Sequence, residues 1–385
     1  MNPAHKILYI DTAEELDSFC ATLRTADWMA LDTEFLREKT YYPKLCLLQL
    51  ATPDCVACID PLALDELAPL LDILFDEDIT KVMHSGRQDM EIFYHLTGKL
   101  PSPVFDTQIA ALMLGYPEQI GYAKLVNDEL GIELDKLHTR ADWTLRPLTE
   151  DQIQYAADDV IYLVEIYQSL SAKLAALGRN DWLLEDFQRL TDAEWYSNPP
   201  EDAWQKVKGG NRLKGKSLSI LQTLATWRER KAQQKDRPKG WILRDDALID
   251  ISRHRPVSLD ALAKIRGLSE GLVRNSGNKI IELVKDASGK TPIPYPDIID
   301  KRTKLTPDQN VLVDVMMALV RQSGEQNSLN PAVLASRKQL EKLLLGDQDA
   351  ELVQGWRKRL VGEQLLEFLN GELRLSVDDG RLAIK

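Results

Sequence analysis

The stretch Trp28-Met29-Ala30-Leu31-Asp32-Thr33-Glu34-Phe35 decides how the first half of this 385-residue chain is interpreted. Its apolar start predicts a β-strand. Residues two apart on a strand project from the same face, so Asp32 and Glu34 should point together. Desolvated carboxylates held close raise each other's pKa, and a hard divalent cation removes that conflict. The stretch therefore predicts paired acids at a metal site, although two solvated acids at a strand end would show the same pattern.

Strands and helices alternate on both sides of this stretch. Further strands are expected at 45–50, 56–59 and 79–83, and helices at 67–75, 107–114, 122–130 and 149–177. Turn signals at Pro43 and Pro53-Asp54 separate the first three strands, which favours a meander of antiparallel neighbours. Thr149 and Gln152 have the spacing of a capping box, so the long helix should begin near Glu150. The pattern is mixed α/β.

Further acids follow on other elements. Asp89 comes after a strand and the turn His84-Ser85-Gly86, while Tyr155 and Asp159 lie at i and i+4 on one helix face. Asp158 points about 100° away on the same helix and is expected to be structural or to support the metal-binding acids without binding the metal itself. Asp106 precedes an apolar helical run and is best interpreted as a helix N-cap.

Three segments together resemble the DEDD superfamily of 3′–5′ exonucleases. They are Leu31-Asp32-Thr33-Glu34-Phe35, His84-Ser85-Gly86-Arg87-Gln88-Asp89 and Tyr155-Ala156-Ala157-Asp158-Asp159. The position of Tyr155 is similar to that in the tyrosine-type branch. The stretch Asp142-Trp143-Thr144-Leu145-Arg146-Pro147-Leu148 resembles the ribonuclease D family, and the middle of the chain resembles the HRDC domain. The resemblance covers most of residues 5–290 and is weak beyond them.

The resemblance implies a ribonuclease H-like α/β exonuclease domain with a mixed sheet, followed by two all-α, HRDC-type modules. Breaks at Asn198-Pro199-Pro200, at Gly209-Gly210-Asn211 and in the proline-rich stretch 291–296 support this division. We expect an exonuclease domain with its linker at 1–205. A basic HRDC domain should follow at 206–290, and an HRDC-like domain at 291–385.

The resemblance also implies a reaction. Asp32, Glu34, Asp89, Tyr155 and Asp159 would be the catalytic residues of a 3′–5′ exoribonuclease that releases nucleoside 5′-monophosphates. Asp32 would bridge two Mg²⁺ or Mn²⁺ ions, with Glu34 and Asp159 completing one site and Asp89 holding the second through water. Tyr155 would orient or help deprotonate the attacking water. The implied substrates are RNAs with an accessible 3′ end, such as transfer-RNA precursors.

Charge is distributed unevenly along the chain. The total of -12 divides into about -22 for residues 1–205, +11 for residues 206–290 and -1 for the remainder. An acidic body with a basic module fits a metal-dependent enzyme with a polyanion-binding arm, although a solvated basic face would give the same count. The residues expected to bind RNA are Lys206, Lys208, Arg212, Lys214, Lys216, Arg228, Arg230 and Lys231.

Composition and short motifs indicate the compartment of the protein and the ligands that it is not expected to bind. Four scattered cysteines fit a reducing compartment, and the start of the chain has no leader pattern, so we expect a cytoplasmic protein without a membrane span. Neither Gly86 nor Gly209-Gly210 has P-loop spacing, so no nucleoside triphosphate is implied. We expect a monomer. Two alternatives stay open: a proofreading DNA exonuclease, and a non-catalytic RNA-binding protein, which the intact set of five residues disfavours.

Overall fold

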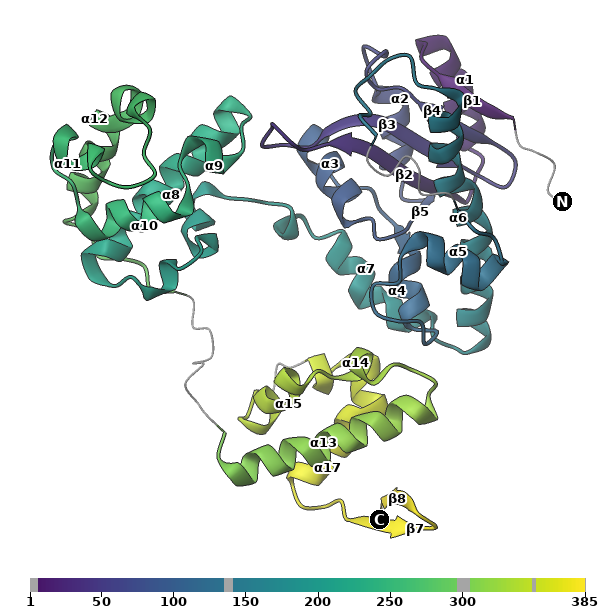
Figure 1. The fold of residues 1–385 in the computed structure, drawn as a ribbon. Helices are drawn as coiled ribbons and strands as arrows, with labels where there is room; N and C mark the ends of the chain where they lie inside the picture. The colour runs from purple at the N-terminus through teal and green to yellow at the C-terminus, as the bar shows by residue number, and fades with distance from the viewer. Residues whose placement is uncertain (1–5, 135–140, 296–304, 348–350, 385) are drawn as a thin grey trace. The chain divides into compact units, whose positions relative to one another are not determined.

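The chain forms two compact units. The computed structural model describes residues 6–134, 141–295, 305–347 and 351–384 (Figure 1). The first unit contains Met1–Glu34, Leu45–Trp195 and Lys304–Lys385, and the second contains Phe35–Lys44 and Tyr196–Thr303. The predicted break at 291–296 ends at Pro296, which lies outside the described residues.

A six-stranded mixed sheet forms the centre of the first unit. Its strands are β1 (Ile7–Ile10), β2 (Trp28–Leu36), β3 (Lys44–Ala51), β4 (Val56–Ile59), β5 (Thr80–Met83) and β6 (Val104–Asp106). They lie in the order β1-β4-β3-β2-β5-β6. The β1–β4, β2–β5 and β5–β6 pairs are parallel, and β3–β4 is antiparallel. The sheet thus places the acid-bearing strand β2 next to β5, which leads into the segment that carries Asp89.

The predicted neighbours β2, β3 and β4 are confirmed, as is the strand at 79–83. Two strands of this sheet were not predicted. β6 has only three residues, and β1 joins the sheet by pairing with β4 across more than 40 residues of chain. Strands this short give too few alternations for a sequence pattern, so their pairing has to be supplied by the tertiary structure.

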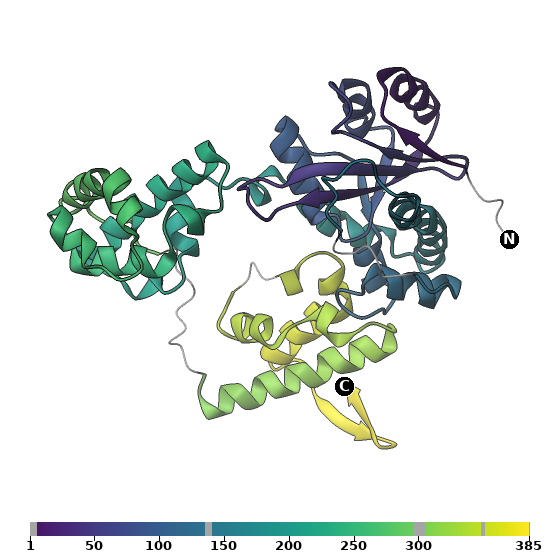
Figure 2. The same ribbon diagram turned by 45° about the horizontal axis from the view of Figure 1, so that its top comes forward.

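Helices cover both faces of this sheet. They are α1 (Ala13–Leu23), α2 (Ala68–Leu74), α3 (Arg87–Thr97), α4 (Thr107–Leu112), α5 (Tyr122–Leu130), α6 (Glu150–Ala176), the short 3₁₀ turn η1 (Asn180–Leu183) and α7 (Leu184–Leu190). Figures 1 and 2 show α1 and α2 on one side of the sheet and α6 on the other. α6 begins with the predicted capping box of Thr149 and Gln152, which is confirmed. This cap fixes the start of the helix that carries Tyr155 and Asp159.

The C-terminal segment belongs to the first unit. Its elements are α13 (Pro307–Gln326), α14 (Pro331–Leu334), α15 (Arg337–Leu344), η5 (Glu351–Val353), α16 (Gly355–Arg357), the π-helical turn η6 (Lys358–Gly362), α17 (Glu363–Leu369), β7 (Leu375–Asp378) and β8 (Arg381–Ile384). Its buried residues share one apolar core with α4, α5 and α6. Trp182 stacks on Trp356 with ring centroids 4.9 Å apart, and Arg179 Nη2 donates to Asn327 O at 2.7 Å. The antiparallel hairpin β7–β8 was not predicted, because this region was expected to be entirely helical.

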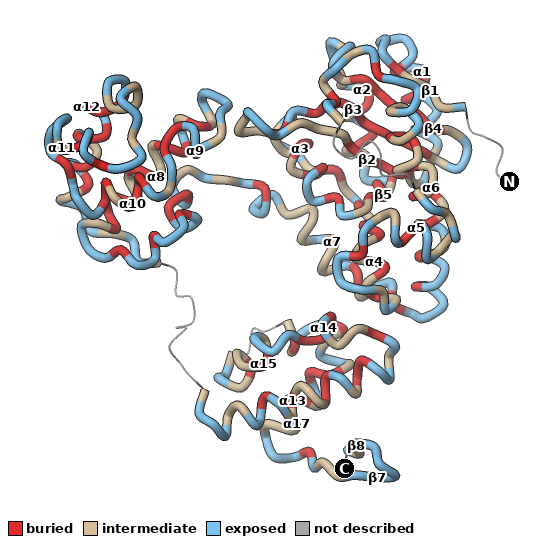
Figure 3. Tube along the Cα trace, in the orientation of Figure 1, coloured by how far each residue is buried: buried red, intermediate tan, exposed pale blue. Residues whose placement is uncertain are grey.

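The second unit is helical around its own core. It contains η3 (Pro200–Lys206), η4 (Gly210–Arg212), α8 (Gly215–Lys235), α9 (Lys239–Ile242), α10 (Asp245–His254), α11 (Leu259–Ala263) and α12 (Glu270–Ala287). Figure 3 shows buried residues along the inner sides of these helices and along the strands of the first unit. No single helix in the described part of the chain is long and apolar enough to cross a membrane. One sharply bent pair, Glu150–Ala176 with Asn180–Leu190, meets the criterion by length and composition only.

The turn between β5 and α3 depends on Asp106. Its carboxylate accepts hydrogen bonds from the backbone N–H groups of Ser85 (3.1 Å) and Gly86 (2.9 Å) as well as from Gln108 (2.8 Å) at the start of α4. The predicted role of Asp106 as an N-cap is therefore confirmed. Ser85 has φ +58°, and a Cβ on Gly86 would lie 2.5 Å from Met83 Sδ, so this tight turn requires a glycine.

Replacing Asp106 by alanine should destabilise the first unit strongly. Asp106 is 2% exposed, and its loss removes the cap of α4 and leaves buried N–H groups without an acceptor, at a cost of about 2–4 kcal/mol in the free energy of unfolding. Thr12→Ala removes the exposed cap of α1 and should cost about 1 kcal/mol or less. Urea unfolding followed by circular dichroism measures both. Equal losses in the two variants would contradict a special role for Asp106.

Candidate active site

The structure brings the four predicted acids together from three elements. Asp32 and Glu34 lie on β2, Asp89 lies in the first turn of α3, and Asp159 lies on α6. Burial raises the pKa of Asp32 well above its ordinary value, and the charges of Asp89, Asp159 and Glu34 raise it further. A carboxylate whose ionisation is opposed by three others shares one electrostatic site with them.

The pKa values of the other three acids are also raised, mainly by burial. Burial first, and then the charges of Asp159 and Asp89, raise the pKa of Glu34 to about 8. Burial raises the pKa of Asp89 to about 7, although the Thr33 hydroxyl donates a hydrogen bond to its carboxylate and opposes the shift. Burial, followed by the charge of Asp158, raises the pKa of Asp159 to about 7. Without a cation, this cluster favours protonated acids at neutral pH.

The donor set suits hard divalent cations. Carboxylate oxygens are the ligands that Mg²⁺ prefers in proteins, and Mg²⁺ keeps several of its waters when it binds. In the described part of the chain, no three His, Cys, Asp or Glu side chains are arranged so that they could hold an ion as they stand. Sites with one or two carboxylates per ion and water in the other positions do not need such a group. The acids therefore fit divalent cations by their chemistry and their charge.

Tyr155 lies one turn before Asp159 on α6, as predicted. Its ring centroid is 6.2 Å from that of Trp143, and the two rings are tilted by 31°. Trp143 is 3% exposed and lies in the segment just before α6. The position of the phenol is thus linked to a buried tryptophan.

Tyr122 is a neighbour of the acid cluster that the sequence did not indicate. Its hydroxyl donates to Asp158 O at 3.1 Å, across 36 residues of chain. Burial raises the pKa of Tyr122 well above its ordinary value, and the charges of Asp159 and Asp32 add to the shift, so the phenol stays protonated. In the sequence, Tyr122 marked only the start of a predicted helix, so its approach to the acids had no local signal.

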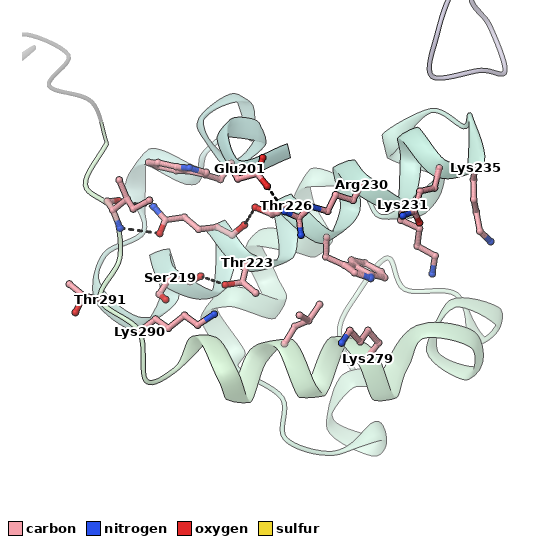
Figure 4. A pocket seen from close by; sticks show the side chains of 16 residues that line it. Glu201, Ser219, Thr223, Thr226, Arg230, Lys231, Lys235, Lys279, Lys290 and Thr291 are labelled. Atoms are coloured by element: carbon pink, nitrogen blue, oxygen red, sulfur yellow. Dashed lines mark hydrogen bonds and ion pairs between the residues drawn. The ribbon is translucent and has the colours of Figure 1, made fainter. Parts of the chain in front are cut away.

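The second unit contains a basic groove of about 800 Å³. Its basic lining residues are Arg230, Lys231, Lys235, Lys279 and Lys290. Figure 4 shows these side chains around the hollow formed by α8, α12 and the residues that follow α12. Lys231 Nζ lies 4.8 Å from the centroid of the Trp227 ring and donates to Ser276 Oγ at 2.7 Å. Arg230 pairs with Glu201, the one acidic residue in the described lining.

The predicted RNA-binding residues fall into three groups. Arg230 and Lys231 line the groove, whereas Arg228 is 1% exposed and donates to Leu243 O (3.0 Å) and Asp245 Oδ1 (2.6 Å). The prediction for Arg228 is wrong, because a buried, paired guanidinium cannot reach a phosphate. The remaining five are exposed on η3, η4 and the start of α8 or next to them: Lys206, Lys208, Arg212, Lys214 and Lys216.

The region that contains the acids and the region that contains the basic groove each match a known protein family. Residues 7–175 match the 3′-5′ exonuclease family, and residues 217–284 match the HRDC domain. The chain is 40% identical to a ribonuclease D from Sphingobium indicum over 377 residues, which are 97% of each chain. The chain belongs to the ribonuclease D family. It is accordingly a 3′–5′ exoribonuclease, which decides against the DNA proofreading and non-catalytic alternatives.

Two further relatives support membership in the ribonuclease D family. A ribonuclease D from Nitrobacter hamburgensis is 38% identical over 376 residues, covering 97% of this chain and 98% of its own. The crystal structure of Escherichia coli RNase D superimposes with a TM-score of 0.82 at 34% identity and covers 95% of this chain and 99% of its own. The similarity therefore includes the exonuclease domain, the HRDC domain and the C-terminal segment.

The raised carboxyl pKa values predict an unusual pH dependence of stability. The folded pKa values of about 7 for Asp89 and Asp159 lie above the ordinary carboxyl value near 4, so the folded protein binds more protons than the unfolded chain between these limits. In EDTA, the protonated carboxyl groups favour the folded state, and this stabilisation is fully present below about pH 4. It is lost as the pH rises toward about 7 to 8.

In thermal melts across this pH range, the melting temperature of Asp89→Asn should fall less with rising pH than that of the wild type, because asparagine does not titrate. Asp17→Asn, at an exposed position on α1, is the matched control and should follow the wild type. Adding Mn²⁺ should restore the wild-type melting temperature most strongly at high pH, where the carboxylates are ionised. An Asp89→Asn profile parallel to that of the wild type would contradict the shift.

Proposed function

We propose that this exoribonuclease hydrolyses the terminal phosphodiester of RNA with two divalent ions, Mg²⁺ or Mn²⁺, and releases nucleoside 5′-monophosphates. The proposal rests on the cluster of the buried Asp89 and the half-buried Asp32, Glu34 and Asp159, in which desolvation and the neighbouring charges raise the pKa values of Asp32 and Glu34. A cluster of this kind is costly to keep ionised at neutral pH unless cations are bound. Removing the cations should therefore affect both activity and stability.

Each of the four acids would have its own role in binding the two ions. Asp32 would contribute to both sites, Glu34 and Asp159 would complete one, and Asp89 would hold the second through water. When bound, the ions supply the positive charge that acidifies an attacking water and stabilises the leaving 3′ oxygen. Tyr155 lies one turn from Asp159 and would orient that water through its hydroxyl. A phenol with an ordinary pKa near 10 is a weak base, so its main contribution is orientation.

The basic groove of the second unit would contact the RNA backbone. Lys231 and Trp227 lie together there, and such a pair offers a charge for a phosphate and a ring face for a base. Arg230 lines the same groove, and its exposed pair with Glu201 can be exchanged for a phosphate at little cost. The exposed residues Lys206, Lys208, Arg212, Lys214 and Lys216 would extend this contact.

Transfer-RNA precursors with unpaired 3′ ends are the proposed substrates. The E. coli relative is described as an exoribonuclease involved in structured RNA processing, which supports a folded RNA with a free end. We further propose that the protein acts as a monomer in the cytoplasm. Its four cysteines are free, which fits a reducing compartment.

Replacing Asp32 by asparagine should lower the rate of RNA shortening by at least about 1000-fold, equivalent to about 4 kcal/mol of barrier, while RNA affinity stays within a few-fold. The reason is that the variant loses the carboxylate shared by both ion sites but keeps the basic groove. Asp158→Asn, one residue from Asp159, is the matched control and should retain most of the activity. A time course in Mg²⁺ on one RNA with a free 3′ end and another with a blocked 3′ end provides the measurement.

Only the free end should be shortened, and EDTA should stop the reaction. Wild-type turnover by Asp32→Asn, or internal cleavage of the blocked RNA, would overturn the mechanism.

Neutralising the groove should weaken RNA binding and flatten its salt dependence. Three lost phosphate contacts on a single strand should reduce the slope of log affinity against log salt by about 2. The test variant is Lys235→Gln, Lys279→Gln and Lys290→Gln combined. Its control removes the same charge outside the groove, at the exposed Lys264, Arg266 and Lys285. Fluorescence anisotropy in EDTA measures both, and equal slopes for the two variants would contradict groove binding.

A further inference from the structure

Arg146 uses every hydrogen-bond donor of its guanidinium. Nε donates to Asp60 Oδ2 at 2.5 Å, and Nη2 donates to Asp60 Oδ1 and to Cys46 O at 2.7 Å each. Nη1 donates to Trp143 O and Leu145 O at 2.8 Å each. An arginine has five N–H donors, so this set is complete. Such a fork has a fixed geometry that a lysine cannot reproduce.

The acceptor of this fork is itself firmly held. Asp60 directly follows β4, is 2% exposed, and also accepts from the Tyr9 hydroxyl (2.6 Å) and Leu62 N (2.9 Å). Burial acts to raise the pKa of Asp60, but hydrogen bonds from Arg146 and Tyr9 outweigh it and keep the pKa below its ordinary value. Asp60 is therefore charged at neutral pH. Through Asp60 and Cys46, Arg146 fixes the segment 143–146 to β1, β3 and β4.

This segment leads directly to the proposed catalytic tyrosine. Arg146 holds Trp143 by its carbonyl oxygen, and the buried Trp143 ring lies 6.2 Å from the Tyr155 ring. The start of α6 has a second attachment to the sheet, because Cys58 Sγ lies 3.7 Å from Ile153 O. The fork thus holds the backbone of Trp143, whose ring packs beside the phenol.

We propose that Arg146 is a positioning residue that acts on the reaction through Trp143 and Tyr155. This inference rests on the proposed function of Tyr155 in orienting the attacking water. All five N–H donors of Arg146 have protein acceptors, so none is left for a substrate. Displacement of a reacting group by about 1 Å can cost on the order of 100-fold in rate, so a small shift of the phenol is sufficient for a large effect on kcat.

A double-mutant cycle on the full-length protein tests this inference. Arg146→Lys keeps the charge but loses the fork, and it should lower kcat for single-stranded RNA in Mg²⁺ by about 10–100-fold with KM nearly unchanged. Tyr155→Phe should also lower kcat. If Arg146 acts through the phenol, Arg146→Lys in the Tyr155→Phe background should change kcat by less than about 3-fold.

Arg179 provides the matched control. It is a buried arginine of the first unit, 8% exposed, and like the half-buried Arg146 it donates to backbone carbonyls, Met113 O and Asn327 O, at 2.7 Å each. Arg179→Lys should lower the melting temperature, while its effect on kcat should be small and the same in both backgrounds. A purely structural role for Arg146 would give the same behaviour as this control.

Each outcome decides the inference. Equal losses of kcat from Arg146→Lys in the wild-type and Tyr155→Phe backgrounds overturn the positioning role and leave the role of Tyr155 intact. Wild-type kcat in Tyr155→Phe overturns the proposed role of Tyr155 and this inference with it. If Arg146→Lys does not fold, Trp143→Phe takes its place in the cycle, with the same non-additive loss expected and an additive loss as the contradiction.

Discussion

Desolvation of four neighbouring acids, Asp32, Glu34, Asp89 and Asp159, with charge repulsion added at Asp32 and Glu34, is the constraint on which the candidate active site depends. Carboxylates that are buried within one another's fields favour protonation or separation, and both would abolish a cation site. The fold opposes separation because the acids lie on regular elements: a central strand, the first turn of a helix after its neighbouring strand, and a helix of 27 residues. Cations held by these acids would oppose protonation. Stability and activity would then be linked through the same four side chains.

Two polar networks hold these elements in register. Asp106 ties the turn before α3 to the start of α4, and so fixes the helix that carries Asp89. Arg146 and Asp60 tie the segment before α6 to the sheet, and so fix the helix that carries Tyr155 and Asp159. Both networks centre on a buried aspartate that accepts several hydrogen bonds, so each has one preferred arrangement. The elements that carry the four acids are therefore held by residues outside the acid cluster.

The sequence indicated the parts of this site that have local signals. The Thr149 capping box, the Asp106 cap and the acidic end of β2 follow from short-range stereochemistry, and the structure agrees with them. Partners far apart in the chain gave no such signal: Arg146 meets Asp60 across 86 residues, and Tyr122 meets Asp158 across 36. Charge counting indicated a basic module but could not separate the buried Arg228 from exposed neighbours. Nor did any local pattern show that the C-terminal segment shares a core with α4 to α6.

If divalent cations complete the acid cluster, calorimetric titration of the metal-free protein with Mn²⁺ should detect them. Titrations near pH 7 in two buffers with different heats of ionisation count the ions bound and the protons released. We expect two ions to bind with net proton release, because acids with pKa values of about 7 and 8 must ionise to bind them. Asp32→Asn should abolish saturable binding at one site or at both. Binding without proton release, or binding that this substitution leaves unchanged, would show that the acid cluster does not hold the cations.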